Sequence, residues 1–168
     1  MNISQRLTLI CSLLTASLIA TVVVSLIVIS GFQSRFQYVQ ANAIPSIIDL
    51  GELVNGSNKL IIWMYRHQTA INDQRQAEVE KEIDNQLGAL FTLNGYYLKN
   101  DISSEEDLRM TQAASLTLQE LKNRFPIFLQ ASRARDNSIS LNALQSSDGV
   151  GQAARDLIAG YQKQLKLM

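Results

Sequence analysis

Residues 7–29 read LTLICSLLTASLIATVVVSLIVI, and no charged residue occurs between Arg6 and Arg35. A helix rises about 1.5 Å per residue, so this stretch is about 35 Å long as a helix. The hydrocarbon core of a bilayer is about 30 Å thick, and such a helix crosses it with modest tilt. The stretch therefore predicts a transmembrane helix, and the rest of the chain is expected to be attached to a lipid bilayer through residues 7–29.

Two other interpretations of this stretch are disfavoured. The apolar core of a cleaved signal peptide is about 7–15 residues, which is shorter than residues 7–29, and Ser30 and Gly31 do not form a clear cleavage site. A buried core helix is unexpected, because so short a chain cannot surround it. We therefore expect an uncleaved signal-anchor in residues 1–31 and a separate domain in residues 32–168.

The orientation of this anchor follows from the segment that it precedes. Flanking charge is uninformative, since Arg6 on one side faces Arg35 on the other. A long polar segment after an export anchor favours a cytoplasmic N-terminus. We expect residues 1–31 to start in the cytoplasm and cross the membrane, with residues 32–168 on the opposite side.

The overall composition predicts helices and argues against nucleic acid as a partner. The 168 residues include 15 basic and 15 acidic side chains, for a formal net charge of zero, without a basic block. Nucleic acid binding needs a concentrated basic surface. Leu, Ala, Gln, Glu, Lys and Arg are abundant, and they lose little side-chain freedom in a helix. The single cysteine, Cys11, excludes a disulfide within one chain.

The first helix beyond the membrane is expected at residues 32–72, with a local kink at Pro45, which lacks an amide hydrogen. Residues spaced by three and four positions mark two faces of this helix. Such a wide stripe is expected when one side packs inside a bundle and the other contacts a partner chain. The first face comprises Ile44, Ile47, Gly51, Val54, Asn58, Ile61 and Tyr65, and the second comprises Leu50, Leu53, Ser57, Leu60, Met64 and Ile71.

Three further helices are expected. The second covers residues 75–99, with an inward face of Val79, Ile83, Leu87, Leu90, Leu93 or Asn94, and Tyr97. A capping box of Ser103 and Glu106 predicts the start of the third, whose inward face comprises Leu108, Thr111, Ser115, Leu118, Leu121, Phe125 and Phe128. Pro126 predicts a kink in it, and its end is predicted at either 136–138 or 146–149.

The last helix is expected at residues 150–168. Short connections make successive helices antiparallel, so an up-down-up-down four-helix bundle continuing from the transmembrane helix is predicted. At 1.5 Å per residue the last helix is about 28 Å long against about 60 Å for the first, so it is expected to be incomplete.

The order of these elements resembles the N-terminal sensory part of bacterial methyl-accepting chemotaxis receptors, which consists of the first transmembrane helix and a four-helix-bundle ligand-binding domain. The resemblance covers essentially the whole chain and stops before the second transmembrane helix of such receptors. The residues that carry it are Ala43-Ile44-Pro45-Ser46-Ile47, Trp63-Met64-Tyr65-Arg66, Tyr96-Tyr97 before Ser103-Ser104-Glu105-Glu106, and Ser147-Asp148-Gly149 with Ala153-Ala154.

The resemblance implies a homodimer paired through the first helix, with a ligand at that interface and a piston-like slide of the last helix. A small molecule such as a carboxylate, or a ligand-loaded periplasmic binding protein, is the expected partner. The input domain of a membrane histidine kinase or cyclase and a stand-alone anchored adaptor remain alternatives. An electron-transfer bundle is a further alternative, which an absorption spectrum would exclude.

Five residues are candidates for ligand binding. Arg66 lies late in the first helix, where the resemblance places carboxylate-binding arginines, and a guanidinium offers two donors to a carboxylate. Arg75 is the second candidate, and nine residues of continuous helix would place it on the opposite face, acting across the dimer interface. Tyr65, Thr69 and Ser147 complete the set, although Tyr65 also fits the core. Ile71 stands where amino-acid receptors have a further arginine, so an amino-acid ligand is not specifically predicted.

No enzyme, metal or cofactor is predicted. His67 is the only histidine, and we expect it at a surface or interface rather than on haem. Zinc needs several Cys or His ligands, and di-iron bundles use Glu-x-x-His pairs, which the sequence lacks. The sequence also shows no evident Ser-His-Asp arrangement and no phosphate-binding loop.

Overall fold

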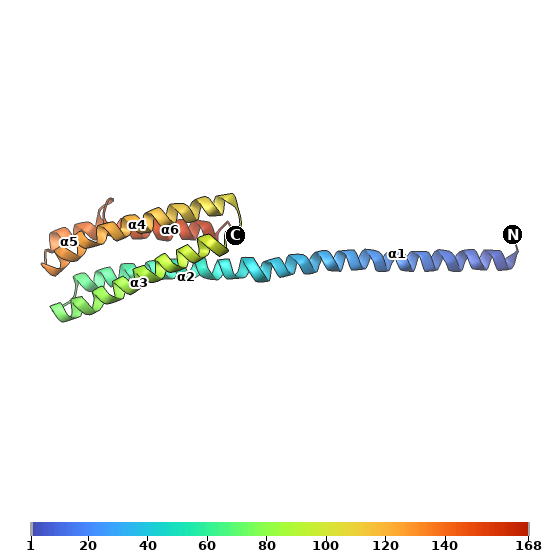
Figure 1. Cartoon of the computed structure of the whole chain (residues 1–168), viewed down its shortest axis with the longest axis horizontal. Helices are drawn as coiled ribbons and strands as arrows, with labels where there is room; N and C mark the ends of the chain where they lie inside the picture. The colour runs from blue at the N-terminus through green and yellow to red at the C-terminus, as the bar shows by residue number, and fades with distance from the viewer. Residues whose placement is uncertain (1, 168) are drawn as a thin grey trace. The chain divides into compact units, whose positions relative to one another are not determined.

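The structure is a computed structural model that describes residues 2–167. It is 89% helical, and the described residues contain no strand, which confirms the expected all-α class. The elements in chain order are α1 (Ile3–Tyr38), the π-helical segment η1 (Val39–Ala43), α2 (Ile44–Gln68), α3 (Asp73–Asn100), α4 (Glu105–Arg133), α5 (Asn137–Gln145) and α6 (Val150–Leu165) (Figure 1).

The chain divides into two compact units after Ala41. This division lies ten residues beyond the predicted boundary between the anchor (residues 1–31) and the domain that follows it. The first unit consists mainly of α1, and none of the described side chains of α1 is buried. Within the described residues, α1 supplies the one stretch that is long and apolar enough to cross a membrane. The hydroxyls of Thr8, Thr15 and Thr21 donate to carbonyls four residues earlier. These polar groups are thus satisfied inside the helix, as a bilayer requires.

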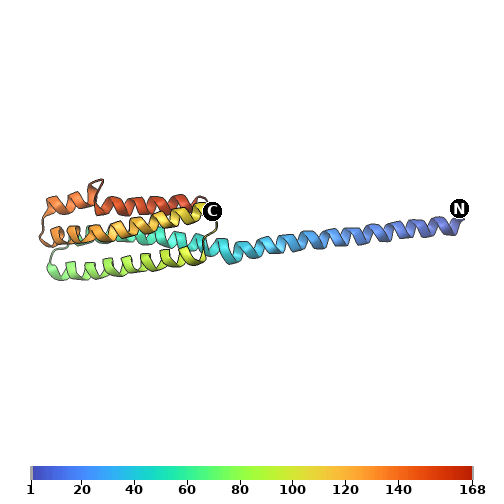
Figure 2. The same cartoon turned by 45° about the horizontal axis from the view of Figure 1, so that its top comes forward.

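The second unit, from Asn42 onward, is called the helical unit below. Helix α2 packs against α3 and α6, and α4 packs against the same two helices, so that each of the four has two neighbours. Figure 2 shows these four helices side by side, with the short α5 next to α4 and α6. The apolar sides of the helices therefore enclose one core.

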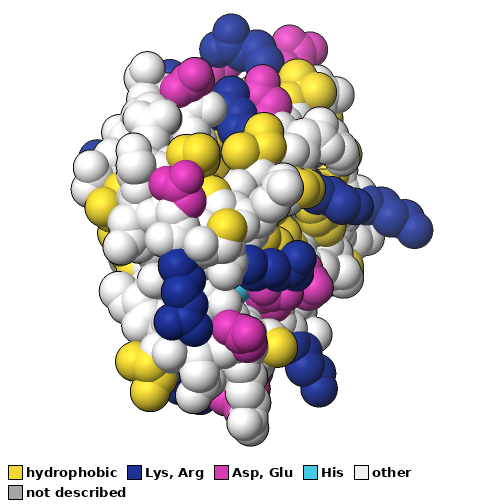
Figure 3. Space-filling model, turned by 90° about the vertical axis from the view of Figure 1, so that its left-hand side faces the viewer, with side chains coloured by type: hydrophobic (Ala, Val, Ile, Leu, Met, Phe, Trp, Pro, Cys, Tyr) yellow, Lys and Arg dark blue, Asp and Glu magenta, His cyan; other side chains and the backbone are white. Residues whose placement is uncertain are grey.

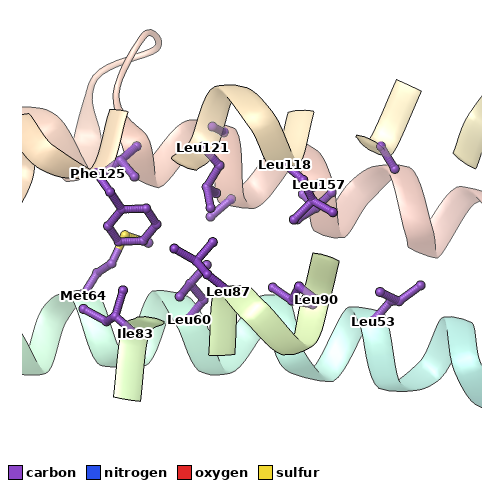
Figure 4. Close-up of a cluster of buried hydrophobic side chains, with 14 of the residues drawn as sticks. Leu53, Leu60, Met64, Ile83, Leu87, Leu90, Leu118, Leu121, Phe125 and Leu157 are labelled. Atoms are coloured by element: carbon purple, nitrogen blue, oxygen red, sulfur yellow. The ribbon is translucent and has the colours of Figure 1, made fainter. Parts of the chain in front are cut away.

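The core of the helical unit contains mainly leucine and aromatic side chains from all four long helices (Figure 4). Leu60 and Met64 of α2 face Ile83 of α3 and Phe125 of α4. Each fully buried side chain of this size contributes about 1.5–3 kcal/mol relative to exposure. The inward face expected for residues 75–99 is confirmed, with Asn94 rather than Leu93 buried.

The two predicted faces of the first helix differ in burial. The second face is buried, apart from Ile71, which is 82% exposed because α2 ends at Gln68 and not near residue 72. The first face is only partly buried: Val54 and Ile61 pack against the core, whereas Ile44, Ile47 and Tyr65 remain exposed. Packing within one chain thus buries the second face of α2 and leaves part of the apolar first face uncovered.

Pro45 lies in the first turn of α2, directly after η1. A proline has no amide hydrogen to donate, and the first turn of a helix needs none. The interruption expected at Pro45 is thus a change from π-helical to α-helical hydrogen bonding. Pro126, where the sequence predicts a kink, lies inside α4, and this helix is continuous from Glu105 to Arg133.

The start of α4 differs from the predicted capping box. Ser104, not Ser103, is the N-cap, and its hydroxyl accepts from the amide of Asp107 at 3.1 Å. Asp107 replaces Glu106 as the acidic partner, accepting from the amide and hydroxyl of Ser103 at 2.8 and 3.0 Å. The register shifts by one residue because Asp107 is drawn inward by Tyr97 and Gln164. As a result, Leu108 is exposed although the sequence pattern predicts it in the core.

Both stretches predicted as possible ends of the third helix contain a break between helices. A short helix that the sequence did not predict lies between them. Helix α4 ends at Arg133, and Arg135 adopts the left-handed conformation at φ 57°. The amide of Asp136 then donates to the carbonyl of Ala131 at 2.9 Å, which is the Schellman arrangement. Helix α5 follows, and the turn around Ser147 leads into α6.

Candidate functional site

An open cleft of about 650 Å³ lies at the turn between α2 and α3. Its walls come from the last turn of α2, the connecting residues and the first turns of α3. Three of the five candidate residues, Arg66, Thr69 and Arg75, line it. The full set of lining residues is Arg66, Thr69, Ala70, Ile71, Asn72, Gln74, Arg75 and Glu78.

The local sequence explains why the chain reverses here. The Thr69 hydroxyl donates to the carbonyl of Tyr65 at 2.9 Å, which closes the last turn of α2. Asn72 is the N-cap of α3, and its side-chain oxygen accepts from the amide of Arg75 at 2.8 Å. Asparagine is favoured at this position because it satisfies an amide that has no partner in the helix.

The relation between Arg66 and Arg75 is therefore not the one predicted. The prediction assumed a continuous helix, with the two side chains on opposite faces and acting across a dimer interface. The break at Thr69–Asn72 places Arg75 on α3 and both residues on the same cleft of one protomer.

The cleft has both positive and negative charge. Arg75 pairs with Glu78 at 2.8 Å, and both side chains are about half exposed. The Arg66 guanidinium lies over the Trp63 ring, 4.7 Å from its centroid, a cation–π contact. In the described part of the chain no carboxylate lies within ion-pair distance of Arg66. Figure 3 views this end of the helical unit, where basic and acidic side chains are interspersed with apolar ones.

Two smaller hollows of about 250 and 330 Å³ adjoin the cleft along α2 and α3, sharing Arg75 and Arg66 with it. Trp63 and Glu82 line both hollows. The sequence analysis did not propose Trp63, Glu78 or Glu82 as site residues. Trp63 precedes Arg66 by three positions, one helical turn, and this spacing is the signal that would have linked them.

Tyr65 and Ser147, the other two candidates, do not line the cleft. Tyr65 is 39% exposed on the uncovered face of α2 and does not belong to the core, because the buried stripe passes through Met64 and His67. Ser147 is exposed in the turn between α5 and α6. Helix α5, absent from the prediction, separates this turn from the end of α4.

His67 is fully buried, so the expected surface or interface histidine is also wrong. Its Nε2 lies 2.9 Å from Glu80 of α3, and its Nδ1 lies 2.8 Å from the hydroxyl of Ser132 of α4. A carboxylate only accepts, so Nε2–H donates to Glu80, and in the neutral ring Ser132 donates to Nδ1. The end of α2 is thereby joined to α3 and α4.

Glu80 also accepts two hydrogen bonds from the Arg133 guanidinium, one of them from Nε at 2.6 Å. These bonds, more than those from His67, lower the pKa of Glu80 below its ordinary value. Ser132, His67 and Glu80 follow the order of a catalytic triad. The Ser132 hydroxyl is buried, however, so the group clamps three helices together and presents no accessible nucleophile. The sequence spacing of these residues gives no sign of it.

No cluster of three or more His, Cys, Asp or Glu side chains suited to a metal ion occurs among residues 2–167. The cleft instead offers two guanidinium groups and the carboxylate of Glu78, and the adjoining hollows add the carboxylate of Glu82 and the indole ring of Trp63. Such groups bind small polar molecules through hydrogen bonds and charge.

None of the protein-family models, curated proteins or solved structures compared with this chain matches it.

Proposed function

We propose that this chain is the ligand-sensing input module of a transmembrane receptor of the chemotaxis type. In this proposal α1 anchors the chain in a bacterial inner membrane and continues into an antiparallel up-down-up-down four-helix bundle in the periplasm. The apolar length of α1 supports the anchor. The helix contacts and short connections of the helical unit support the bundle. The cleft between α2 and α3 supports sensing.

The single observation that carries the ligand proposal is the pairing of Arg66 and Arg75 on one cleft. Arg75 is already neutralised in part by Glu78, whereas Arg66 lies over the Trp63 ring and has no ion-pair partner among the described residues. A guanidinium without a carboxylate partner at the edge of a cleft is suited to bind an anionic group with two hydrogen bonds. The ligand is therefore proposed to be a small carboxylate.

Replacing Arg66 by alanine is expected to weaken carboxylate binding by about 10- to 100-fold, since a hydrogen bond to a charged group contributes about 1.5–3 kcal/mol. The chain has one tryptophan, Trp63, in contact with Arg66. Its fluorescence therefore reports binding directly when the full chain in nanodiscs is titrated with amino acids, organic acids and aromatic acids.

The matched control for this titration is Arg109→Ala, which removes an exposed guanidinium near the start of α4, away from the cleft. This variant should bind as the wild type does. A carboxylate that binds Arg66→Ala and the wild type with equal affinity would exclude the role assigned to Arg66.

The uncovered face of α2 supports a homodimer. The exposed side chains of the first face, Ile44, Ile47, Asn58 and Tyr65, carry no charge. The charged residues Glu52 and Lys59 are exposed on the neighbouring stripe of α2, together with Ile48, Asn55 and Ile62. A two-fold interface brings the same patch of both protomers together, so an uncharged face avoids like-charge contacts. The proposal therefore pairs two protomers through α2.

Ile47→Lys is expected to raise the dimer dissociation constant by about 100-fold, because two like charges would meet at the two-fold axis. Light scattering of the full chain in detergent micelles measures the change. Ile127→Lys, at an exposed apolar position on α4, is the control and should leave the dimer intact. Equal dissociation constants for both variants would exclude α2 as the interface.

A further inference from the structure

A small cavity of about 210 Å³ lies beyond the end of α3 that is far from the cleft, between the start of α4 and the end of α6. Neither the cleft nor the clamp around His67 shares a residue with this cavity. The residues that line it are Ser103, Ser104, Glu106, Asp107, Gln164 and Leu167.

Gln164 of α6 contributes an unpaired buried oxygen to this place. The residue is 2% exposed, and its Nε2 donates to the carboxylate of Asp107 and, at 2.7 Å, to the hydroxyl of Thr111. The Thr111 hydroxyl already donates its hydrogen to the carbonyl of Asp107, so it can only accept from Gln164. These two acceptors fix the orientation of the amide. Its Oε1 is shielded from solvent and has no hydrogen-bond partner among the described residues.

The unpaired Oε1 requires a donor that the described side chains do not supply. Buried polar atoms are almost always hydrogen-bonded, because an unpaired one keeps the full cost of its desolvation. A carbonyl oxygen only accepts, so the missing partner must carry an N–H or O–H group. A water molecule takes up about 30 Å³ in the liquid. The cavity that Gln164 lines therefore has room for a donor larger than water.

Asp107 makes the cavity negative. It is 5% exposed, and no basic side chain lies within ion-pair distance of it among residues 2–167. Its carboxylate accepts from the Tyr97 hydroxyl at 3.2 Å, from the amide and hydroxyl of Ser103, and from Gln164. These bonds and the N-terminus of α4 stabilise the carboxylate without supplying a formal positive charge. Buried charges are normally paired, so a cationic donor suits the cavity better than a neutral one.

An organic cation suits the cavity better than a metal ion. Calcium takes about six to eight oxygen ligands, and residues 2–167 contain no cluster of three or more His, Cys, Asp or Glu side chains suited to a metal. The second carboxylate of the cavity, from Glu106, already pairs with Arg109 on the surface of α4 at 2.7 Å. Leu167 adds an apolar side chain to the wall. An ammonium group on a short alkyl chain matches this combination.

We propose that this cavity binds the ammonium group of a small primary amine, with Oε1 of Gln164 as the hydrogen-bond acceptor and the Asp107 carboxylate as the counter-charge. The bound amine joins the last turn of α6 to the start of α4. This site is separate from the cleft, and it stands whether or not the chain is a receptor.

The test uses the full chain in nanodiscs of phosphatidylcholine, whose headgroup has no N–H donor. Ethanolamine hydrochloride should shift the backbone amide resonance of Asp107 and the side-chain amide resonance of Gln164 in NMR spectra, and the shifts should saturate. Choline has the charge without N–H donors, and ethylene glycol has a similar size without the charge. Neither compound should shift these resonances. Adding phosphatidylethanolamine to the nanodiscs distinguishes a lipid headgroup, which would shift them without ethanolamine, from a free amine.

Gln164→Met removes the acceptor and keeps a side chain of similar length. It should weaken ethanolamine binding by about 10-fold or more, measured on the Asp107 amide. Gln162→Met, at an exposed position of the same helix, is the matched control and should bind as the wild type does. Wild-type affinity in Gln164→Met, equal binding of choline or ethylene glycol, or no saturable shift would each overturn the proposal. The comparison of the three compounds needs no variant, so it decides the matter even if Gln164→Met does not fold.

Discussion

Asp107→Ala is expected to lower the free energy of unfolding of the helical unit by about 3 kcal/mol. Asp107 is 5% exposed and receives hydrogen bonds from Tyr97, Ser103 and Gln164. Alanine removes this shared acceptor, and each hydrogen bond to a charged group contributes about 1.5–3 kcal/mol. Gln164 keeps a second acceptor in the hydroxyl of Thr111. Loss of the electrostatic repulsion between Asp107 and Asp101 offsets part of this destabilisation. Urea unfolding of the full chain in detergent micelles, followed by Trp63 fluorescence, measures the change.

The control for this prediction is the neighbouring residue Glu106. Its carboxylate is exposed and pairs with Arg109 on the surface of α4, 2.7 Å away. Surface pairs of this kind contribute little, because water screens them. Glu106→Ala should therefore unfold at the urea concentration of the wild type. The sequence pattern assigns the capping role to Glu106. If Glu106→Ala were less stable than Asp107→Ala, that assignment would be correct and the capping by Asp107 seen in the structure would be contradicted.

Gly151→Ala is the second substitution with a large expected effect. A Cβ atom at residue 151 would lie 2.1 Å from the carbonyl oxygen of Leu144, which belongs to the backbone of α5. A backbone atom cannot turn aside as a side chain does, so α5 or α6 must shift. Overpacking of this kind costs about 2–3 kcal/mol. The same urea experiment measures it.

Gly160→Ala, also in α6, is the matched control. No atom outside its own stretch of helix lies within 4 Å of the Cβ position there. Alanine is favoured over glycine inside a helix by about 0.5–1 kcal/mol, so this variant should be more stable than the wild type. Equal effects of the two alanines would mean that α5 does not pack on α6 as described.

The candidate site was predictable in its residue types and in part of its membership. Arg66, Thr69 and Arg75 were singled out, and they share one cleft. Their arrangement depended on the direction of α3 after the turn, because the geometry of Thr69–Asn72 decides which side of α3 faces α2. Tyr65 and Ser147 lie away from this cleft for similar reasons. The helical spacing of apolar residues does not tell which of two apolar faces is buried. The same spacing did not predict α5.

The sequence by itself determined the apolar helix over residues 7–29, the all-α class and most inward positions of α2, α3 and α4. These follow from local composition and a 3.6-residue period, which depend only on neighbours along the chain. Only the tertiary structure decided the burial of His67 and the capping role of Asp107. Each is a polar group whose state depends on partners more than ten residues away or on other helices, and such partners leave no periodic signal in the sequence.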